Sequence, residues 1–312
     1  MQVNQTRALR ITAAAALLAV TGAASALDFS ANIELDNTAR SGNKYNLAAN
    51  AGDKGLTQSG RVELNASGKA GKNWFVAGKA SFLAKKDGSV ATDDMWVQIG
   101  QQSFDVKLGR FEAVDLFPLP GDTLIEETGT VVKTNKLRGR FGDNDFHAAV
   151  TAKLGAGLAA EVGLLDSTVF QETKGVRAAL TYGNGPLAAG FGVENGSQDG
   201  VRNSDFTGFG GYAQYDFGGF KVTGNFATNE QDTGPNTSVK SNAFALVGSF
   251  GPANLGLLQG KTKGLPNTTT FYGSYTLPLF DVKGASITPA VSTSKTGSTK
   301  ANGVRVRINY AF

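Results

Sequence analysis

Acidic side chains crowd one stretch of the sequence. Residues 111–137 carry five carboxylates: Glu112, Asp115, Asp122, Glu126 and Glu127. Carboxylates facing cations across a narrow gap between low-dielectric walls create a field that orders water and orients polar solutes. Because salt screens charges beyond about 8 Å at 0.15 M, such a field acts only in a confined space. The chemistry that this stretch predicts is electrostatic steering of solutes, provided that cations lie opposite it.

The chain is poor in His and Cys, two residue types that often carry out catalysis or bind metals. One His and no Cys cannot furnish a zinc or iron–sulfur site. His147 is the one candidate general base, and no Ser nucleophile motif accompanies it, so we interpret it as a pore-wall residue. We interpret Asp93 and Asp94 as a solvated loop pair, with calcium binding as the alternative. We therefore expect no enzymatic activity, no cofactor and no metal.

The first 26 residues have the pattern of an export signal. Arg7 and Arg10 precede an apolar run of ten residues, and Ala24-Ser25-Ala26 matches a signal-peptidase site. A membrane anchor is the alternative, but crossing a bilayer takes roughly 20 apolar residues. We expect cleavage after Ala26, leaving one domain over residues 27–312. Losing two arginines halves the formal net charge of +4, so the charge gives no argument for nucleic-acid binding.

Residues 27–312 alternate between apolar and polar side chains without a linker. In the last segment Val304, Val306 and Ile308 share one face, and Arg305 and Arg307 share the other. This period of two is typical of strands with one apolar face. By the same alternation, Arg61 faces the polar side of its strand, whereas Arg110 falls on the apolar side unless a bulge turns it inward.

The predicted connections alternate between short and long. Seven short turns fall near residues 71–73, 101–103, 155–157, 184–186, 218–219, 251–252 and 279–282. Eight longer polar loops cover residues 39–56, 85–92, 111–137, 166–174, 195–204, 229–240, 261–268 and 294–302. These fifteen connections predict sixteen strands. Short turns on one side and long loops on the other are typical of outer-membrane barrels.

Aromatic residues gather beside the short turns. They are Trp74, Phe75, Phe104, Tyr182, Phe217, Phe220, Phe250, Phe280 and Phe312. Such a row is typical of the girdle at a membrane interface. A soluble β-sandwich is the alternative, but it would need two domains and a break between them. Because backbone groups in hydrocarbon must all be paired, a spanning sheet has to close on itself. We predict an all-β, sixteen-stranded antiparallel transmembrane barrel with an aqueous channel.

The acidic stretch at residues 111–137 is also rich in apolar residues, among them Phe111, Phe117 and Ile125. A solvent-exposed outer loop would not carry so much apolar surface. Folding inward would bury these side chains and place the carboxylates across the lumen. Arg61, Arg305 and Arg307, which point into the lumen by alternation, would then face them.

Several short motifs carry a family resemblance. They are FDVKLGR at residues 104–110, PLPGDT at 118–123, RGRF at 138–141, NDF at 144–146 and YAF at 310–312. With them the chain resembles the Gram-negative general porins, trimeric sixteen-stranded barrels whose third loop narrows the pore. The stretch GRFEAVDLFPLPGDT is similar to raffinose-type glycoporins. The resemblance implies that Arg110, Arg138 and Arg140 join a basic cluster in the pore. It also implies a homotrimer in the outer membrane, in contact with lipid and lipopolysaccharide.

Three functions are compatible with such a barrel. The first is passive diffusion of small hydrophilic solutes. The second is a sugar-selective channel, including passage of oligosaccharides, along a stacking path. Its candidate aromatics are Trp96, Phe111, Phe117, Phe209 and Tyr272. The third is a surface adhesin or receptor that uses the long loops.

Overall fold

The computed structural model describes residues 27–42, 55–140, 142, 145–167, 172–198, 204–234 and 237–312. The predicted signal peptide, residues 1–26, and most of the first long loop lie outside this part of the chain. Among the described residues, helical structure is limited to short segments, and none of these could cross a membrane.

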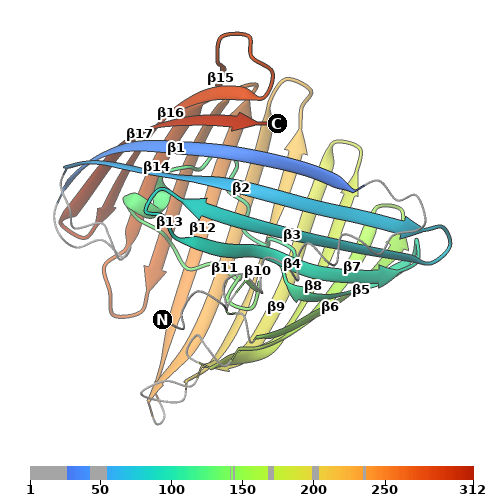
Figure 1. The fold of residues 1–312 in the computed structure, drawn as a ribbon. Helices are drawn as coiled ribbons and strands as arrows, with labels where there is room; N and C mark the ends of the chain where they lie inside the picture. Colours follow the sequence, from blue (N-terminus) through green and yellow to red (C-terminus); the bar gives the residue numbers. More distant parts are fainter. Residues whose placement is uncertain are drawn as a thin grey trace, which may run out of the picture.

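The described residues form a single antiparallel sheet that closes on itself (Figure 1). Its strands are β1 (Asp28–Gly42), β2 (Gly55–Gly71), β3 (Phe75–Lys85), β4 (Val90–Gly100), β5 (Phe104–Arg110), β6 (Phe146–Gly155), β7 (Leu158–Asp166), β8 (Thr173–Asn184), β9 (Leu187–Gln198), β10 (Ser204–Asp216), β11 (Lys221–Gly234), β12 (Thr237–Phe250), β13 (Ala253–Thr262), β14 (Thr268–Tyr275), β15 (Leu277–Pro278), β16 (Ala285–Thr296) and β17 (Thr299–Ala311). Apart from β14 and β15, each strand pairs with its neighbours in sequence, and β1 pairs with β17 to complete the ring. Because β14 and β15 both pair with β16 and are separated by Thr276 alone, they form one barrel strand. The predicted sixteen-stranded barrel is confirmed.

The two faces of each strand differ as the alternation predicts. In β17, Val304 is exposed on the outside, whereas Arg305 is buried on the inside. In β4, Met95, Val97 and Ile99 form an exposed apolar row on the outer face. An apolar band on the outside of a closed sheet is what lipid contact requires.

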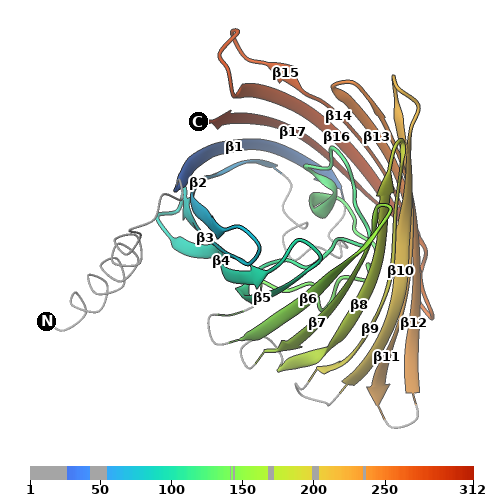
Figure 2. The same ribbon diagram turned by 90° about the vertical axis from the view of Figure 1, so that its right-hand side faces the viewer.

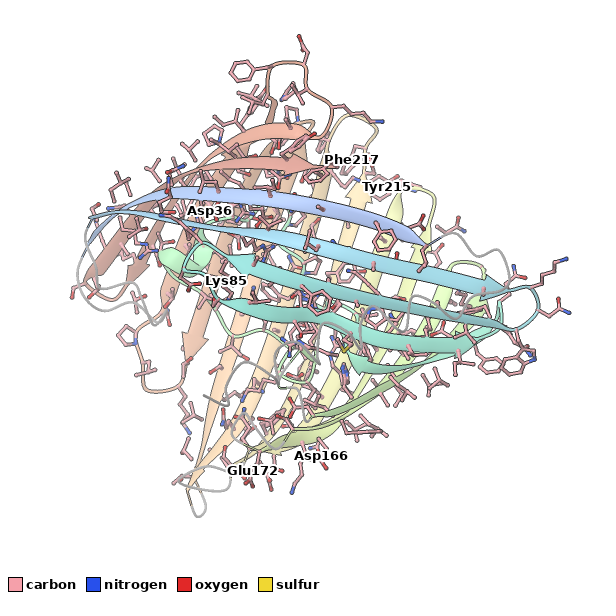
Figure 3. The ribbon with its side chains drawn as sticks, in the orientation of Figure 1. Asp36, Lys85, Asp166, Glu172, Tyr215 and Phe217 are labelled. Carbon is pink, nitrogen blue, oxygen red and sulfur yellow. The ribbon has the colours of Figure 1, made fainter. Side chains whose placement is uncertain are left out.

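Aromatic side chains mark the short-turn end of the barrel. Phe217 stacks on Phe220 with ring centroids 4.5 Å apart, and Phe220 stacks on Phe250 at 5.7 Å. In Figure 3, Tyr215 and Phe217 lie at one end of the barrel, and Asp166 and Glu172 lie at the other. This arrangement agrees with a girdle at one interface.

Two connections predicted as long loops are short. Strand β11 continues to Gly234 and β12 begins at Thr237, and the same holds for β16 and β17, which end and begin at Thr296 and Thr299. Polar residues still pair across these hairpins, as Lys295 does with Lys300. The boundaries predicted at 229–240 and 294–302 are therefore wrong. Polar residues mark the point where a strand leaves the apolar band, but the antiparallel pairing of the two strands continues beyond that point.

Residues 111–140 of the connection between β5 and β6, which we call the inner loop, lie inside the barrel. Figure 2 shows the short 3-10 turn η1 (Ile125–Glu127) within the ring of strands. Phe117, Ile125 and Val131 are buried in one apolar cluster with side chains of the barrel wall. The wall residues of this cluster are Ala227, Ala243, Ala245, Val247, Leu258 and Tyr272. The inward-folded loop is thus confirmed, and burial of its apolar residues supplies the driving force, about 1.5–3 kcal/mol for each large side chain.

Candidate functional site

Wall side chains fasten the inner loop by hydrogen bonds to its backbone. Four donors reach loop carbonyls: Tyr272 Oη to Pro120 at 2.8 Å, Asn225 Nδ2 to Pro118 at 3.0 Å, Ser274 Oγ to Gly121 at 2.7 Å and Thr270 Oγ1 to Gly129 at 3.1 Å. Carbonyls of an irregular segment pressed against a wall need such partners, because a buried unpaired carbonyl is costly. Side chains of β11 and β14 therefore fix the path of the loop.

The first charged group at the loop is the β4 cluster, which we define as Lys79, Asp93, Asp94, Glu112, Asp115, Arg138 and Arg140. Arg140 lies at its centre, with Nη1 3.0 Å from Asp93 Oδ1 and Nε 2.9 Å from Asp94 Oδ1. Asp94 also binds Lys79 Nζ at 2.8 Å. Arg138 Nη2 lies 3.2 Å from Glu112 Oε2, which completes an alternating chain of cations and anions.

A bulge in β4 and an unusual backbone turn assemble this cluster. Ala80 pairs with Met95 but Phe82 pairs with Thr92, so Asp93 and Asp94 together oppose Ser81. A bulge of this kind re-aims side chains. Arg140 has a φ of 62°, and at Gly139, with φ 110°, an added Cβ would lie 2.5 Å from the ring of His147. The glycine lets the chain turn so that Arg140 reaches β4.

The second charged group is the β1–β17 cluster, defined as Glu34, Asp36, Arg61, Arg305 and Arg307. Arg307 donates two hydrogen bonds of 2.7 and 2.8 Å to the carboxylate of Asp36. Arg61 Nε lies 3.0 Å from Glu34 Oε2. These pairs follow from register, because Asp36 is directly opposite Arg307 and Glu34 is directly opposite Arg61. Asp36 lies on β1 in Figure 3. Arg305 also donates to the carbonyl of Thr123, so this cluster touches the inner loop.

A buried arginine holds the two ends of the loop. Arg177 on β8 is 2% exposed and donates to the carbonyl of Val114 at 2.5 Å and to Asn135 Oδ1 at 3.2 Å. Glu161 accepts from Val114 N at 3.0 Å, and Glu194 accepts from Leu137 N at 3.2 Å. Sequence reasoning missed Arg177, Glu161 and Glu194. Their inward parity on strands of small residues was the signal that could have found them.

The predicted loop carboxylates have different environments. Asp122 accepts backbone hydrogen bonds from Leu124 and Ile125, and its burial raises the pKa of this carboxyl above its ordinary value. Asp115 Oδ1 accepts from Phe117 N at 2.8 Å, and Glu126 is exposed. The side chain of Glu127 lies outside the described part of the structure.

The expected opposition of loop acids and wall arginines needs correction. Arg305 and Arg307 bind Asp36 of the adjacent strand. Arg138 belongs to the loop itself and binds its neighbour Glu112. Arg110 donates through Nε to the carbonyls of Thr92 and Asp93, at 3.1 and 2.9 Å. Each set of arginines therefore carries its own carboxylates, and the charge is distributed over two clusters.

Asp93 and Asp94, interpreted from sequence as a solvated pair, lie within β4 and bind Arg140. His147, interpreted as a pore-wall residue, is 3% exposed and stacks on Phe111 at 3.9 Å. The polarity of the Asp pair suggested a loop, whereas the bulge accommodates it in a strand. His147 is covered because Phe111, the first residue of the inner loop, stacks on its ring.

The aromatic stacking path predicted for sugars is absent from the described lumen surface. Phe209 is 47% exposed on the outer face. Phe111 and Phe117 of the inner loop and Tyr272 of the wall are each at most 2% exposed. Trp96 remains, partly exposed on the inner face of β4. The predicted path was wrong because Phe209 faces outward, Phe111 and Phe117 are buried residues of the inner loop itself, and the loop covers Tyr272.

Comparisons with known proteins agree with this architecture. The model of the porin-like glycoporin RafY family matches residues 23–163. No curated protein matches the chain in sequence. The anion-selective porin from Comamonas acidovorans is 18% identical, with a TM-score of 0.69 over 93% of this chain and 100% of that one. The trimer form of OmpT, an outer membrane protein of Vibrio cholerae, is 13% identical with a TM-score of 0.70 over 93% and 100%. A mutant of the Rh. blastica porin is 13% identical with a TM-score of 0.57 over 92% and 100%.

The structural matches and the sequence-based match cover different lengths of the chain. The solved structures share its fold along nearly the whole length, whereas the sequence-based match ends at residue 163. The chain thus has the fold of the outer-membrane porins, and over residues 23–163 it resembles the porin-like glycoporin RafY.

Proposed function

We propose that the protein forms a water-filled channel for passive diffusion of small hydrophilic solutes across the outer membrane, narrowed by residues 111–137. The observation that carries this proposal is the asymmetric placement of the inner loop. The loop buries the inward side chains of β11–β14. By contrast, the inward side chain of Arg61 on β2 stays 41% exposed. The open passage then lies between the loop and the β1–β5 wall.

The two charged clusters would line this passage. Arg138, Arg140 and Glu112 carry partly exposed side chains on the loop side, and Arg61 and Glu34 do so on the β1–β17 side. Solutes passing between them meet charges of both signs at close range. Pore selectivity depends on such lining groups and on diameter. Among the predicted constriction residues on the loop side, Arg140 contacts the most carboxylates, namely those of Asp93, Asp94 and Glu112.

Planar-bilayer recordings test the channel. Purified protein should give stepwise conductance that rises with KCl concentration, and heat-denatured protein is the control. Steps in groups of three would support a homotrimer, as the porin resemblance implies. Protein that is folded by circular dichroism and yet never conducts would contradict the channel.

Sugar selectivity is the second candidate, favoured by the match to the glycoporin RafY model. Saturable block of the ion current by millimolar raffinose, with little block by sucrose, would support it. Equal, non-saturating effects of both sugars favour the general channel.

Export and location complete the proposal. Mass spectrometry of protein isolated from outer membranes should show a chain that begins at Leu27, as cleavage after Ala26 would leave it. Lipopolysaccharide and lipid are the partners expected for its outer face.

A further inference from the structure

Three inward side chains of β4 and β5 have no role in the architecture described above. They are Trp96 and Gln98 on β4 and Lys107 on β5. Their inward direction follows from Val97 and Ile99, which are exposed on the outer face between and beside them. Gln98 pairs directly with Lys107 across the two strands. All three are partly exposed, so they remain accessible from the lumen.

Lys107 differs from the other cations near the inner loop. Lys79, Arg138 and Arg140 all bind carboxylates. Among the described residues, no carboxylate lies within ion-pair distance of Lys107. Its Nζ lies 4.8 Å from the ring centroid of Trp96 and 5.3 Å from that of Phe111. Aromatic faces position this ammonium without neutralising it, which leaves its charge available to a ligand.

The direct partners of Trp96 are Lys79 on β3 and Gly109 on β5, and the side chain of Lys79 is bound to Asp94. The partly exposed indole offers apolar surface next to an ammonium and an amide. Indole surface suits the C–H face of a sugar ring, an amide suits hydroxyl groups, and an ammonium suits a carboxylate.

We infer that Trp96, Gln98 and Lys107 form a lumen subsite for hexuronates, which are sugar rings that bear a carboxylate. This inference rests on the proposed channel function and names a solute class for it. A neutral sugar would leave Lys107 unused, and a small inorganic or open-chain anion would leave the indole unused. A ring with a carboxylate uses all three groups at once.

Solute block of the ion current in planar bilayers tests the subsite. The probes are glucuronate, glucose and gluconate at constant ionic strength. Glucose keeps the ring without the charge, and gluconate keeps the charge without the ring. Glucuronate should block saturably in the millimolar range and bind at least about fivefold more tightly than either control, the scale of one charge-assisted hydrogen bond in a wet site.

Substitutions locate the effect. Lys107→Gln and Trp96→Leu should each weaken glucuronate block by about fivefold or more, whereas Lys107→Arg should retain it. Two matched controls should leave the block unchanged. Lys153→Gln removes a lysine from the inner face of β6, and Trp74→Leu changes an exposed tryptophan at a short turn.

The outcomes separate the subsite from the channel. Absence of ion current in KCl for the wild type would contradict the channel itself. A conducting channel that glucuronate and glucose block equally would overturn the subsite alone, and so would an unchanged block in Lys107→Gln. If Trp96→Leu yields no channels, Gln98→Leu takes its place, and its glucuronate block should weaken relative to the wild type.

Discussion

The inner wall of this barrel has a dry side and a wet side. On β11–β14 the inward residues include aliphatic side chains such as Ala245 and Leu258, which are fully buried beneath the inner loop, and polar side chains such as Asn225 that donate to the loop backbone. On β1–β5 they are charged or polar, and Arg61 and Lys107 stay partly exposed. The same alternation of side chains produces both surfaces. The position of the loop determines which part of the wall stays uncovered, because the apolar residues of the loop pack against the alanine-rich side.

The largest expected effect comes from weakening the dry side. Phe117→Ala removes a side chain that is 1% exposed between the loop and the wall. We expect a loss of about 3–5 kcal/mol in the free energy of unfolding, because the cavity cannot be refilled by water at low cost. Urea titration followed by tryptophan fluorescence measures it. Phe209→Ala, on the outer face, is the matched control and should leave the position of the loop unchanged. A loss below 1 kcal/mol for Phe117→Ala would contradict tight packing of the loop.

An intermediate effect is expected on the wet side. Arg140→Gln removes the cation that binds Asp93, Asp94 and Glu112. Asp93 then loses its cation, whereas Asp94 keeps Lys79 and Glu112 keeps Arg138. One more negative charge then acts on passing ions, and the permeability ratio of K⁺ to Cl⁻ should rise by about two- to fivefold, the scale of one unit charge acting through water. Reversal potentials across a KCl gradient measure this ratio.

Arg140→Lys should keep most of the original selectivity, since it preserves the charge. Lys240→Gln, on the outer face of β12, is the control and should have no effect. Unchanged reversal potentials in Arg140→Gln would place Arg140 outside the ion path.

The smallest effect concerns Asp122 of the inner loop, which accepts hydrogen bonds from Leu124 N and Ile125 N. Burial raises the pKa of its carboxyl. As pH falls, this group is therefore protonated before an ordinary aspartate is, and the folded state gains stability relative to the unfolded state in that window. K⁺ preference should decline slightly as pH falls toward the ordinary titration range of aspartate, and Asp122→Asn should remove this part of the decline. Equal pH dependence in both proteins would show that the ion path does not sense Asp122.

The sequence predicts the barrel better than it predicts the charged clusters. Alternation and turn chemistry are local, so they identify strands and the outward or inward direction of Arg305 and Arg307. The apolar residues Phe117 and Ile125 were enough to predict the inward loop. The partner of Arg307 could not be predicted, because Asp36 lies 271 positions away and meets it only when the ring closes.

Backbone irregularities account for the other differences. The bulge that turns Asp93 and Asp94 toward Arg140 leaves no clear trace in the sequence pattern. The positive φ of Arg140 is equally hidden, since arginine rarely adopts it. Alternation predicts which face of the sheet a side chain lies on, but it does not predict which residue lies opposite on the next strand.

We propose that the inner loop narrows a water-filled channel along the wet side. Single-channel conductance can be compared between the wild type and a variant in which a short Gly-Ser linker replaces residues 114–134. The wild type should conduct in proportion to salt, and the shortened variant should conduct more. A wild type that does not conduct, or a folded variant whose conductance is equal or lower, would contradict it.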